Sequence, residues 1–285
     1  MDDSIWPLSA SLLLGRYRPR ALLARGSNSL VFEGTDETLG RAVAIKVFDA
    51  GADLERYQQE LRLLAGLSHH GVVSIVDAGI DLSTLADPRP FLVMQLIRGA
   101  TLHDTLRQGA LTLRQSAEIG YEVAEALDYV HSQGVIHRDI TPWNVMLTNY
   151  GSVASRSRAR ITDFGIAVTE PSALPTGTAT SPAPPTVGTA AYLSPEQATG
   201  GVLTSATDVY SLGMVMLECY TESIAFPGGA EESVARAYPS SPMSKSIPRQ
   251  WRGLLTRMTS ARPFDRPTAA EVAAEIREIL RSTSR

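Results

Sequence analysis

Residues 188–197 read Gly-Thr-Ala-Ala-Tyr-Leu-Ser-Pro-Glu-Gln, and residues 208–213 read Asp-Val-Tyr-Ser-Leu-Gly. Upstream of this stretch the chain carries further short motifs, each of them weak when taken singly. Val43-Ala44-Ile45-Lys46, for example, would by itself indicate an edge strand that ends in a solvated lysine. In order along the chain, the set comprises a Gly-containing turn at Gly26, Lys46, Glu60, His137-Arg138-Asp139 with Asn144, Asp163-Phe164-Gly165 and Ser194-Pro195-Glu196. Motifs in this order do not coincide by chance, so we treat them as one functional set.

The set resembles the protein kinase superfamily, and it is most similar to the eukaryotic-like (Hanks-type) Ser/Thr protein kinases of bacteria. The likeness extends over about residues 16 to 282. It implies an α+β, bilobal kinase fold with a β-rich N-lobe that holds one main helix and a mainly helical C-lobe. It also implies ATP as the phosphoryl donor and Mg²⁺ or Mn²⁺ as the metal ion.

The order of elements expected from residue patterns agrees with a strand-rich part followed by a helical part. Short β-branched or aromatic runs predict strands, and apolar residues at three- and four-residue steps predict helices. The expected strands are 17–24, 29–34, 42–48, 72–76 and 91–97, and the expected helices are 54–67, 113–131, 206–221, 250–258 and 269–280. We therefore expect an N-terminal extension at 1–15, an N-lobe at 16–97 and a C-lobe at 98–285, with an activation segment at 163–196.

Composition excludes several classes of protein. The 285 residues are 44% hydrophobic and 20% charged, and the net charge of −4 gives no reason to expect a nucleic-acid partner. The single Cys219 cannot form an internal disulfide or a Cys-based metal site, which is typical of a reducing cytoplasm. No apolar stretch approaches the roughly 20 residues that a membrane-spanning helix needs, so no intrinsic membrane segment is expected.

The resemblance implies a role for each residue of the phosphoryl-transfer site. Lys46 would contact the α- and β-phosphates, and Glu60 would hold it in place. Glu60 follows Lys46 more closely than is usual in the family, so Glu55 is a rival partner for Lys46. Asp163 would be the principal metal ligand, with Asn144 supplying an oxygen to a second ion. Asp139 would orient the acceptor hydroxyl and accept its proton, which completes the expected catalytic set.

The nucleotide base needs an apolar slot and backbone hydrogen bonds. By resemblance, Val31, Ala44 and Met146 sandwich the adenine, Met94 lies at the back of the pocket, and the backbone of Gln95 and Ile97 pairs with the adenine edge. The loop over the phosphates departs from the family, because Ala24 and Ser29 stand where glycines are expected and only Gly26 is kept. We expect this loop to be stiffer and ATP to bind more weakly.

A second departure is Thr141, two residues after Asp139, where Ser/Thr kinases usually carry a lysine that contacts the γ-phosphate. A hydroxyl cannot replace this charge, so slow turnover is expected. Two alternatives to a protein kinase stay open: a nucleotide-binding pseudokinase scaffold without transfer, and a small-molecule phosphotransferase of the antibiotic-kinase type. Relatives of the second type usually lack the activation segment, so the Thr-rich loop and Ser194-Pro195-Glu196 favour a protein substrate.

Arg138, next to Asp139, predicts an activation loop that is ordered by phosphorylation, because a phosphate pairs with a guanidinium through bidentate bonds. The candidate phosphorylation sites are Thr176, Thr178, Thr180, Ser181 and Thr186. Self-association would allow one copy of the chain to phosphorylate these sites in another copy. Thr189 is expected to line the acceptor site. The expected structural supports are a buried Glu196–Arg266 ion pair, Asp208 under the catalytic loop, and the packing residues His137 and Phe164. The sequence does not name the substrate, the activating signal or the oligomeric state.

Overall fold

The structure, a computed structural model, describes residues 12–26, 29–49, 61, 64–82, 88–109, 111–148, 158–164, 189–224 and 247–283. These residues fall into two compact units. The first contains the described residues up to Ser68 together with Val73–Arg98, and the second contains His69–Val72 and the described residues from Gly99 onward. The segment His69–Val72 therefore belongs to the second unit although first-unit residues lie on both sides of it in the sequence.

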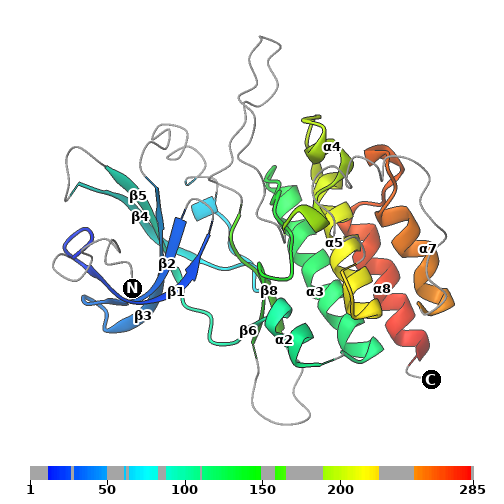
Figure 1. The fold of residues 1–285 in the computed structure, drawn as a ribbon, viewed down its shortest axis with the longest axis horizontal. Helices are drawn as coiled ribbons and strands as arrows, with labels where there is room; N and C mark the ends of the chain where they lie inside the picture. The colour runs from blue at the N-terminus through cyan, green and yellow to red at the C-terminus, as the bar shows by residue number, and fades with distance from the viewer. Residues whose placement is uncertain are drawn as a thin grey trace. The chain divides into compact units, whose positions relative to one another are not determined.

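The first unit is built on one antiparallel sheet in the order β1-β2-β3-β5-β4 (Figure 1). Its strands are β1 (Tyr17–Arg25), β2 (Ser29–Asp36), β3 (Arg41–Phe48), β4 (Ile75–Asp81) and β5 (Arg89–Gln95). On β3, Lys46 lies opposite Val31 of β2 and Leu92 of β5, and Ala44 lies opposite Met94. The register thus places Lys46, Ala44 and Met94 on the central strands of the sheet.

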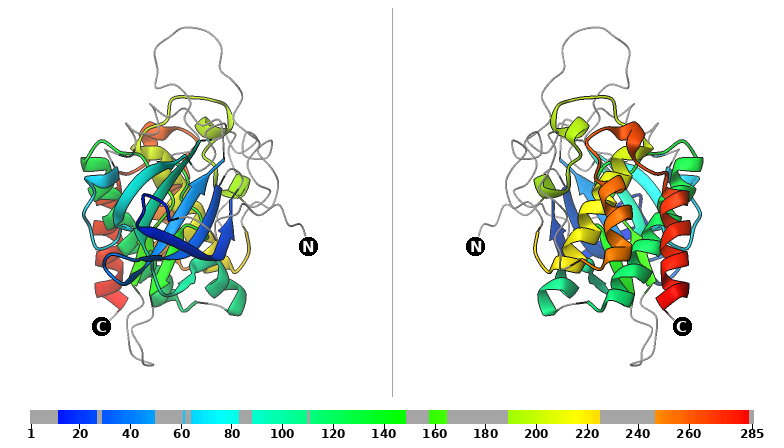
Figure 2. Two further views of the ribbon diagram at one scale, coloured as in Figure 1. Left: turned by 90° about the vertical axis from the view of Figure 1, so that its left-hand side faces the viewer. Right: turned by 90° about the vertical axis from the view of Figure 1, so that its right-hand side faces the viewer.

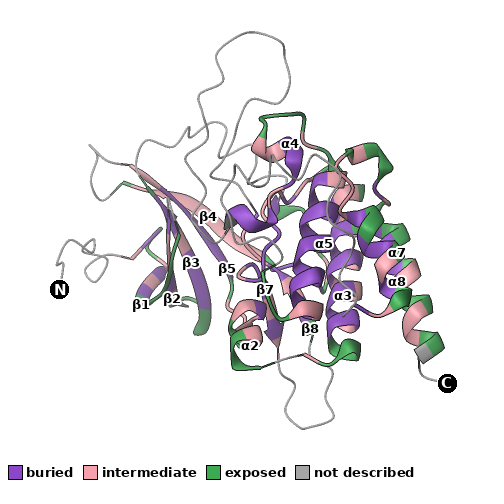
Figure 3. Ribbon diagram, turned by 45° about the vertical axis from the view of Figure 1, so that its right-hand side comes forward, coloured by how far each residue is buried: buried purple, intermediate pink, exposed green. Residues whose placement is uncertain are grey.

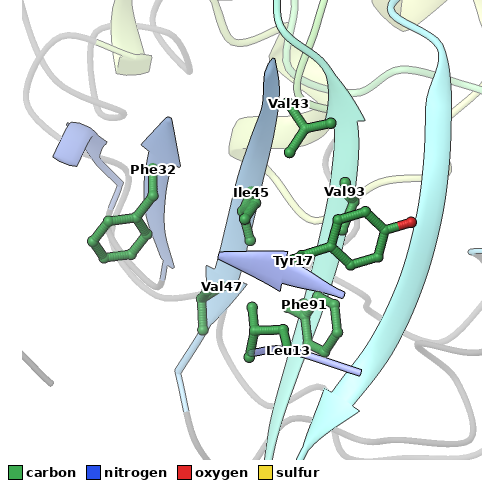
Figure 4. Close-up of a cluster of buried hydrophobic side chains, with 8 residues drawn as sticks. All are labelled: Leu13, Tyr17, Phe32, Val43, Ile45, Val47, Phe91 and Val93. Carbon is green, nitrogen blue, oxygen red and sulfur yellow. The ribbon is translucent and has the colours of Figure 1, made fainter. Parts of the chain in front are cut away.

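A cluster of buried apolar side chains holds this sheet together: Leu13, Tyr17, Phe32, Val43, Ile45, Val47, Phe91 and Val93 (Figure 4). In Figure 4 the hydroxyl of Tyr17 points away from the cluster, and it donates to Asp77 of β4 at 2.7 Å. Leu13, only 2% exposed, bridges to Tyr17 and adds a residue of the expected N-terminal extension to the core. Burying such side chains is the main favourable term in folding, so the first unit has an apolar core of its own.

Asp36, at the end of β2, is buried and carries three charge-assisted bonds. Arg16 donates from Nε and Nη2 at 2.8 and 2.7 Å, and Arg41 donates from Nε at 3.3 Å. The hydrogen bonds from Arg16 hold the pKa of this carboxyl well below its usual range. The Arg16–Asp36 and Arg41–Asp36 ion pairs fix the chain just before β1 and the turn between β2 and β3.

The helix expected at 54–67 lies mostly outside the described residues. Within the described positions, Leu61 and Leu64 are helical, and Leu61, Leu64 and Leu67 are all buried, in agreement with the apolar stripe. The strand expected at 72–76 is wrong, because β4 begins only at Ile75. Val72 instead forms an isolated parallel bridge with Ile161 of the second unit.

The second unit is mainly helical. Its elements are α2 (Leu102–Gln108), α3 (Leu113–Ser132), η1 (Thr189–Tyr192), α4 (Pro195–Ala198), α5 (Ser205–Thr221), α7 (Arg249–Met258), η2 (Pro263–Asp265) and α8 (Ala269–Thr283). Helices α5 and α8 both pack against α3 (Figures 1 and 2). Figure 3 shows α5 buried along most of its length, and its residues from Thr207 to Cys219 are all buried. The central helix of this unit is therefore α5.

Local signals begin these helices where the sequence predicts. Thr268 and Glu271 form the expected capping box, with Glu271 N–H donating to Thr268 Oγ1 at 3.2 Å and Thr268 N–H donating to Glu271 Oε2 at 2.8 Å. Thr112 and Gln115 form a second capping box before α3. No described helix combines the length and the apolar character needed to cross a membrane.

A small sheet in the order β6-β7-β8 carries the segments around the candidate site; its strands are Ala100–Thr101, Val145–Thr148 and Arg158–Ile161. Gly99 precedes β6 at a point where a Cβ atom would lie 2.1 Å from the carbonyl oxygen of Leu147. Ile161 N–H donates to Gly71 O at 2.9 Å, which attaches the segment His69–Val72 to β8.

Candidate active site

The loop from His137 to Asn144 is suspended from the central helix by one carboxylate. Asp208 of α5 is buried and accepts from the backbone N–H of His137 at 2.8 Å and from that of Arg138 at 2.7 Å. His131 of α3 lies 2.8 Å from the same carboxylate. Arg138 itself has a φ of 70°. A non-glycine residue in this region costs of order 1–3 kcal/mol, and the two hydrogen bonds donated to Asp208 offset this strain.

His137 is fully buried and neutral. Its Nε2 lies 3.0 Å from Thr162 O, and Asp139 N–H donates to its Nδ1 at 3.3 Å. A carbonyl only accepts and an N–H only donates, so both bonds require the proton on Nε2 and none on Nδ1. Burial lowers the pKa of His137, in agreement with the neutral form. The ring also lies 4.5 Å from that of Phe164, so both act as packing residues beneath the loop.

Asn144 links the two acidic residues of the site. Its amide nitrogen donates to Asp139 Oδ2 at 2.8 Å and to Asp139 O at 2.9 Å, which holds the carboxylate of Asp139 against the loop. The backbone oxygen of Asn144 accepts from Thr162 N–H at 2.9 Å, one residue before Asp163. The structure thus brings Asp139, Asn144 and the Asp163 backbone together. Asp163, like Arg138, has a positive φ, 56°.

The oxygen donors here fit a hard divalent cation. With its nitrogen committed to Asp139, the amide of Asn144 presents its oxygen as the remaining ligand atom, and its backbone is bonded to Thr162, one residue before Asp163. Among the described residues, no three His, Cys, Asp or Glu side chains form a metal site by themselves. A metal ion at Asn144 and Asp163 would need further oxygen ligands from phosphate and water, as Mg²⁺ usually takes.

The expected nucleotide residues of the first unit lie on its sheet and at its end. Ala24 pairs with Val31 across β1 and β2, and Gly26 N–H donates to Ser29 O at 2.8 Å, which closes the turn between them. Ala44 and Met94 are buried neighbours on β3 and β5, and Lys46 is half-buried. Gln95 N–H donates to Ser74 O at 2.9 Å, so its pairing with a base would use its carbonyl oxygen. Ile97 follows β5 and is half-buried.

Several expected residues lie outside the described part of the chain. They are Glu60 and its rival Glu55, Gly165, and the candidate phosphorylation sites Thr176, Thr178, Thr180, Ser181 and Thr186. The backbone of Thr189 forms the first residue of η1, while its side chain is not described. Their roles stay predictions.

Comparison with known proteins identifies the family. The sequence model of the protein kinase domain matches residues 17–276, which is most of the chain. The chain belongs to the protein kinase family. Members of this family use ATP and a divalent metal ion.

The curated relatives are bacterial Ser/Thr protein kinases. The chain is 36% identical over 252 residues to the serine/threonine-protein kinase PknA of Mycobacterium tuberculosis, covering 85% of this chain and 56% of that protein. It is 33% identical over 277 residues to PknB of Mycobacterium leprae, covering 93% of this chain and 43% of that protein. The kinase chain thus spans about half the length of these relatives. The likeness to bacterial Ser/Thr kinases predicted from the motifs is confirmed.

The solved kinase domain of PknI from Mycobacterium tuberculosis has the same fold. It superposes with a TM-score of 0.71 at 22% identity, over 96% of this chain and 99% of that one. At this identity the likeness concerns the fold alone. It confirms the predicted fold class, α+β with a β-sheet unit and a mainly helical unit.

The segment of η1 and α4 is anchored at three points. Arg266 donates from Nη1 and Nη2 to the two carboxylate oxygens of Glu196 at 2.6 and 2.8 Å, and its side chain is fully buried. Burial raises the pKa of Glu196, but the hydrogen bonds and charge of Arg266, together with hydrogen bonds from the backbone and Thr207, lower it by more in sum, so the net shift is downward. Gln197 Nε2 donates to Arg138 O at 2.7 Å, and Ser211 Oγ donates to Tyr192 O at 2.9 Å. These bonds tie η1 and α4 to α5 and to the loop from His137 to Asn144.

The loop from His137 to Asn144 contains one residue whose burial the sequence did not show, Thr141, and one residue that the sequence analysis missed, Trp143. Thr141, which stands in place of the usual lysine, is only 3% exposed, and its carbonyl accepts from Asn144 N–H at 3.1 Å. Trp143, which no motif singled out, stacks on His103 of α2 with ring centroids 4.3 Å apart. The only sequence signal for Trp143 was its place directly before Asn144.

Proposed function

We propose that this kinase transfers the γ-phosphoryl group of ATP to Ser or Thr hydroxyls of proteins, including those of its own activation segment. The observation that supports it best is the pair of Asn144 bonds to Asp139, because they hold a carboxylate beside a metal-binding amide oxygen on a loop fixed by Asp208. The names of the curated relatives support a Ser/Thr acceptor.

In this mechanism Asp139 orients the acceptor hydroxyl and accepts its proton as the new O–P bond forms. Asn144 holds the Asp139 carboxylate in place and, with Asp163, would bind Mg²⁺ or Mn²⁺, which supplies positive charge to the phosphates. Lys46 would contact the α- and β-phosphates, with Glu60 or Glu55 orienting it. Val31, Ala44 and Met146 would sandwich the adenine, with Met94 at the back of the pocket. Thr141 carries no charge, so we expect slow turnover.

Arg138 supports control by phosphorylation of the activation loop. Its Nε atom is buried and has no hydrogen-bond partner among the described residues. A buried N–H donor without an acceptor is costly, and a phosphate on Thr176, Thr178, Thr180, Ser181 or Thr186 would provide one. Self-association would bring one copy's loop to another copy's Asp139, and we place this reaction in the cytoplasm.

The test is incubation of the purified chain with radiolabelled ATP and Mg²⁺, followed by mass spectrometry of the 176–186 loop. Asp139→Asn is expected to lower labelling about 100- to 10,000-fold while ATP binding, measured by thermal shift, is kept. Asp128→Asn, on the exposed face of α3, is the matched control and should label like the parent chain. ATP binding without any label on the parent chain would identify a pseudokinase scaffold instead.

A further inference from the structure

Phe48 of β3 places an aromatic ring beside the ammonium group of Lys46. The Nζ atom of Lys46 lies over the ring of Phe48, 5.3 Å from its centroid. An ammonium group within about 6 Å of the face of an aromatic ring is attracted by the negative charge density on that face. Phe48 follows Lys46 by two positions on one strand, so the two side chains point to the same face of the sheet.

This face of the sheet is the one that the proposed function assigns to the nucleotide. Ala44 lies two residues before Lys46 on β3, and Met94 lies opposite Ala44 on β5, so both share the face of Lys46. The alternate residues of β3 belong to the apolar cluster on the other face, and they are Val43, Ile45 and Val47 (Figure 4). The ring of Phe48 therefore lies on the nucleotide face of β3, not in that cluster.

The surroundings of Lys46 on the sheet favour a contact between its charge and the ring. Val31 of β2 and Leu92 of β5 lie directly opposite Lys46, and both are apolar. Lys46 itself is half-buried, so water screens its charge less than it would at the surface. Phe48 is only 3% exposed, so packing already holds its ring in place.

A contact with the ring does not prevent Lys46 from binding phosphate. An ammonium group carries several N–H donors, so one that rests on a ring still has donors for a carboxylate and for phosphate oxygens. The lysine side chain is also flexible, and a contact that restricts it before the nucleotide arrives lowers the entropy cost of binding. The ring can therefore prepare Lys46 for the nucleotide without competing with it.

We propose that Phe48 is a positioning residue for Lys46, whose ammonium group its ring holds on the nucleotide face of β3 before ATP binds. The inference rests on the contact between Lys46 and the phosphates in the proposed function, because Phe48 acts on the nucleotide only through Lys46. A cation–π contact of this kind should strengthen nucleotide binding by about two- to fivefold. An aliphatic side chain would fill the same space without attracting the charge.

The contact has a spectroscopic signature, because Lys46 and Lys245 are the only lysines of the chain. Selective isotope labelling of lysine therefore gives two Cε–Hε signals in a nuclear magnetic resonance spectrum, and Lys46→Met identifies the Lys46 signal by its loss. In the parent chain the ring current of Phe48 should shift this signal upfield. Phe48→Leu should abolish the shift and Phe48→Tyr should keep it. A Lys46 signal without an upfield shift in the parent chain would overturn the inference, and this measurement needs no variant of Phe48.

Binding of Mg·ADP, measured by titration calorimetry, tests the consequence for the site. This nucleotide carries the α- and β-phosphates but has no γ-phosphate to transfer. Phe48→Leu should weaken its binding about two- to fivefold in the parent chain and should not change it in Lys46→Met, where no ammonium group is present. Phe48→Tyr should bind like the parent chain.

The matched control is Phe32→Leu, the same substitution at a residue that is 4% exposed in the cluster on the other face. It should leave both the Lys46 signal and the affinity for Mg·ADP unchanged. Equal weakening by Phe48→Leu with and without Lys46 would show that Phe48 acts through packing alone, and the inference would be wrong. Expected coupling without phosphoryl transfer from ATP would refute only the kinase proposal, whereas transfer without coupling or upfield shift would refute only the role of Phe48.

Discussion

Replacing Glu196 by Gln should destabilise the second unit strongly, because it leaves a buried guanidinium without its counter-charge. Arg266 is fully buried and makes two bonds to Glu196. Its other acceptors are backbone oxygens, Ser260 O at 2.7 Å, Ala206 O at 3.0 Å and Ala261 O at 3.2 Å. These dipoles stay in place in the variant but cannot neutralise a full positive charge.

The expected cost follows from the burial of the pair. Breaking a buried ion pair by removing one partner costs about 3–5 kcal/mol. The three remaining carbonyls compensate in part, so we expect the lower end, about 3 kcal/mol, which corresponds to a fall in melting temperature of roughly 6–12 °C for a chain of this size. Urea unfolding followed by circular dichroism measures this as a lower midpoint at an unchanged slope.

The matched control is Glu275→Gln, which breaks the Arg257–Glu275 pair. Both partners of that pair are well exposed, at 49% and 39%, so its loss should cost less than about 1 kcal/mol. Equal midpoints for Glu196→Gln and Glu275→Gln would refute the reasoning, because burial would then make no difference. A restored midpoint in Glu196→Met combined with Arg266→Met would support it, since an apolar pair leaves no charge to desolvate.

Three further predictions concern the loop, the small sheet and pH. Asp208→Ala removes the acceptor of two backbone N–H groups. It should lower the free energy of unfolding by about 2–3 kcal/mol, measured by urea unfolding. It should also reduce kcat by a larger factor than it weakens ATP binding, measured by steady-state kinetics. Gly99→Ala places a Cβ 2.1 Å from Leu147 O and should lower the free energy of unfolding by about 1–3 kcal/mol, measured by thermal melting. Its control is Gly253→Ala, on the exposed face of α7, where a Cβ would have no neighbour nearer than 3.9 Å. This control should be neutral or stabilising in the same assay. The pKa of His137 is lower in the folded chain than in the unfolded chain, so the unfolded chain binds a proton at a higher pH. The free energy of unfolding should therefore fall as pH drops below about 6.5. In urea unfolding at a series of pH values His137→Asn should flatten that slope, and an equally steep slope in the variant would contradict the assignment.

Local signals were sufficient where a pattern repeats within one element. The helices at 113–131, 206–221 and 269–280 lie within one to three residues of α3, α5 and α8, and the Thr268–Glu271 box was predicted because both of its residues lie in one turn. The strand predicted at 72–76 was wrong because Val72 and Val73 have strand-like side chains, yet Gly71 and Val72 pair with β8 instead of with the large sheet. Helix α2, with 7 residues, is too short for a helical period to appear.

The candidate site could be read from the sequence only as far as its motifs extend. Asp139, Asn144 and Asp163 stand in recognisable motifs, and the structure brings their backbones together. The contacts of Trp143 with His103 and Tyr192 join positions 40 and 49 residues away, which no spacing rule connects. Such contacts are set by tertiary packing and appear only once the elements are assembled.

The attachment of His69–Val72 to β8 bears on how this chain can be divided. A fragment that starts at Gly99 would lack Gly71, whose carbonyl accepts the N–H of Ile161. It would also remove the Gly71 backbone from beside the methyl group of Ala126 on α3. Cutting the polypeptide before Gly99 therefore separates the helical unit from four of its own residues. A truncated or domain-swapped version of the helical half would have to carry this tetrapeptide with it.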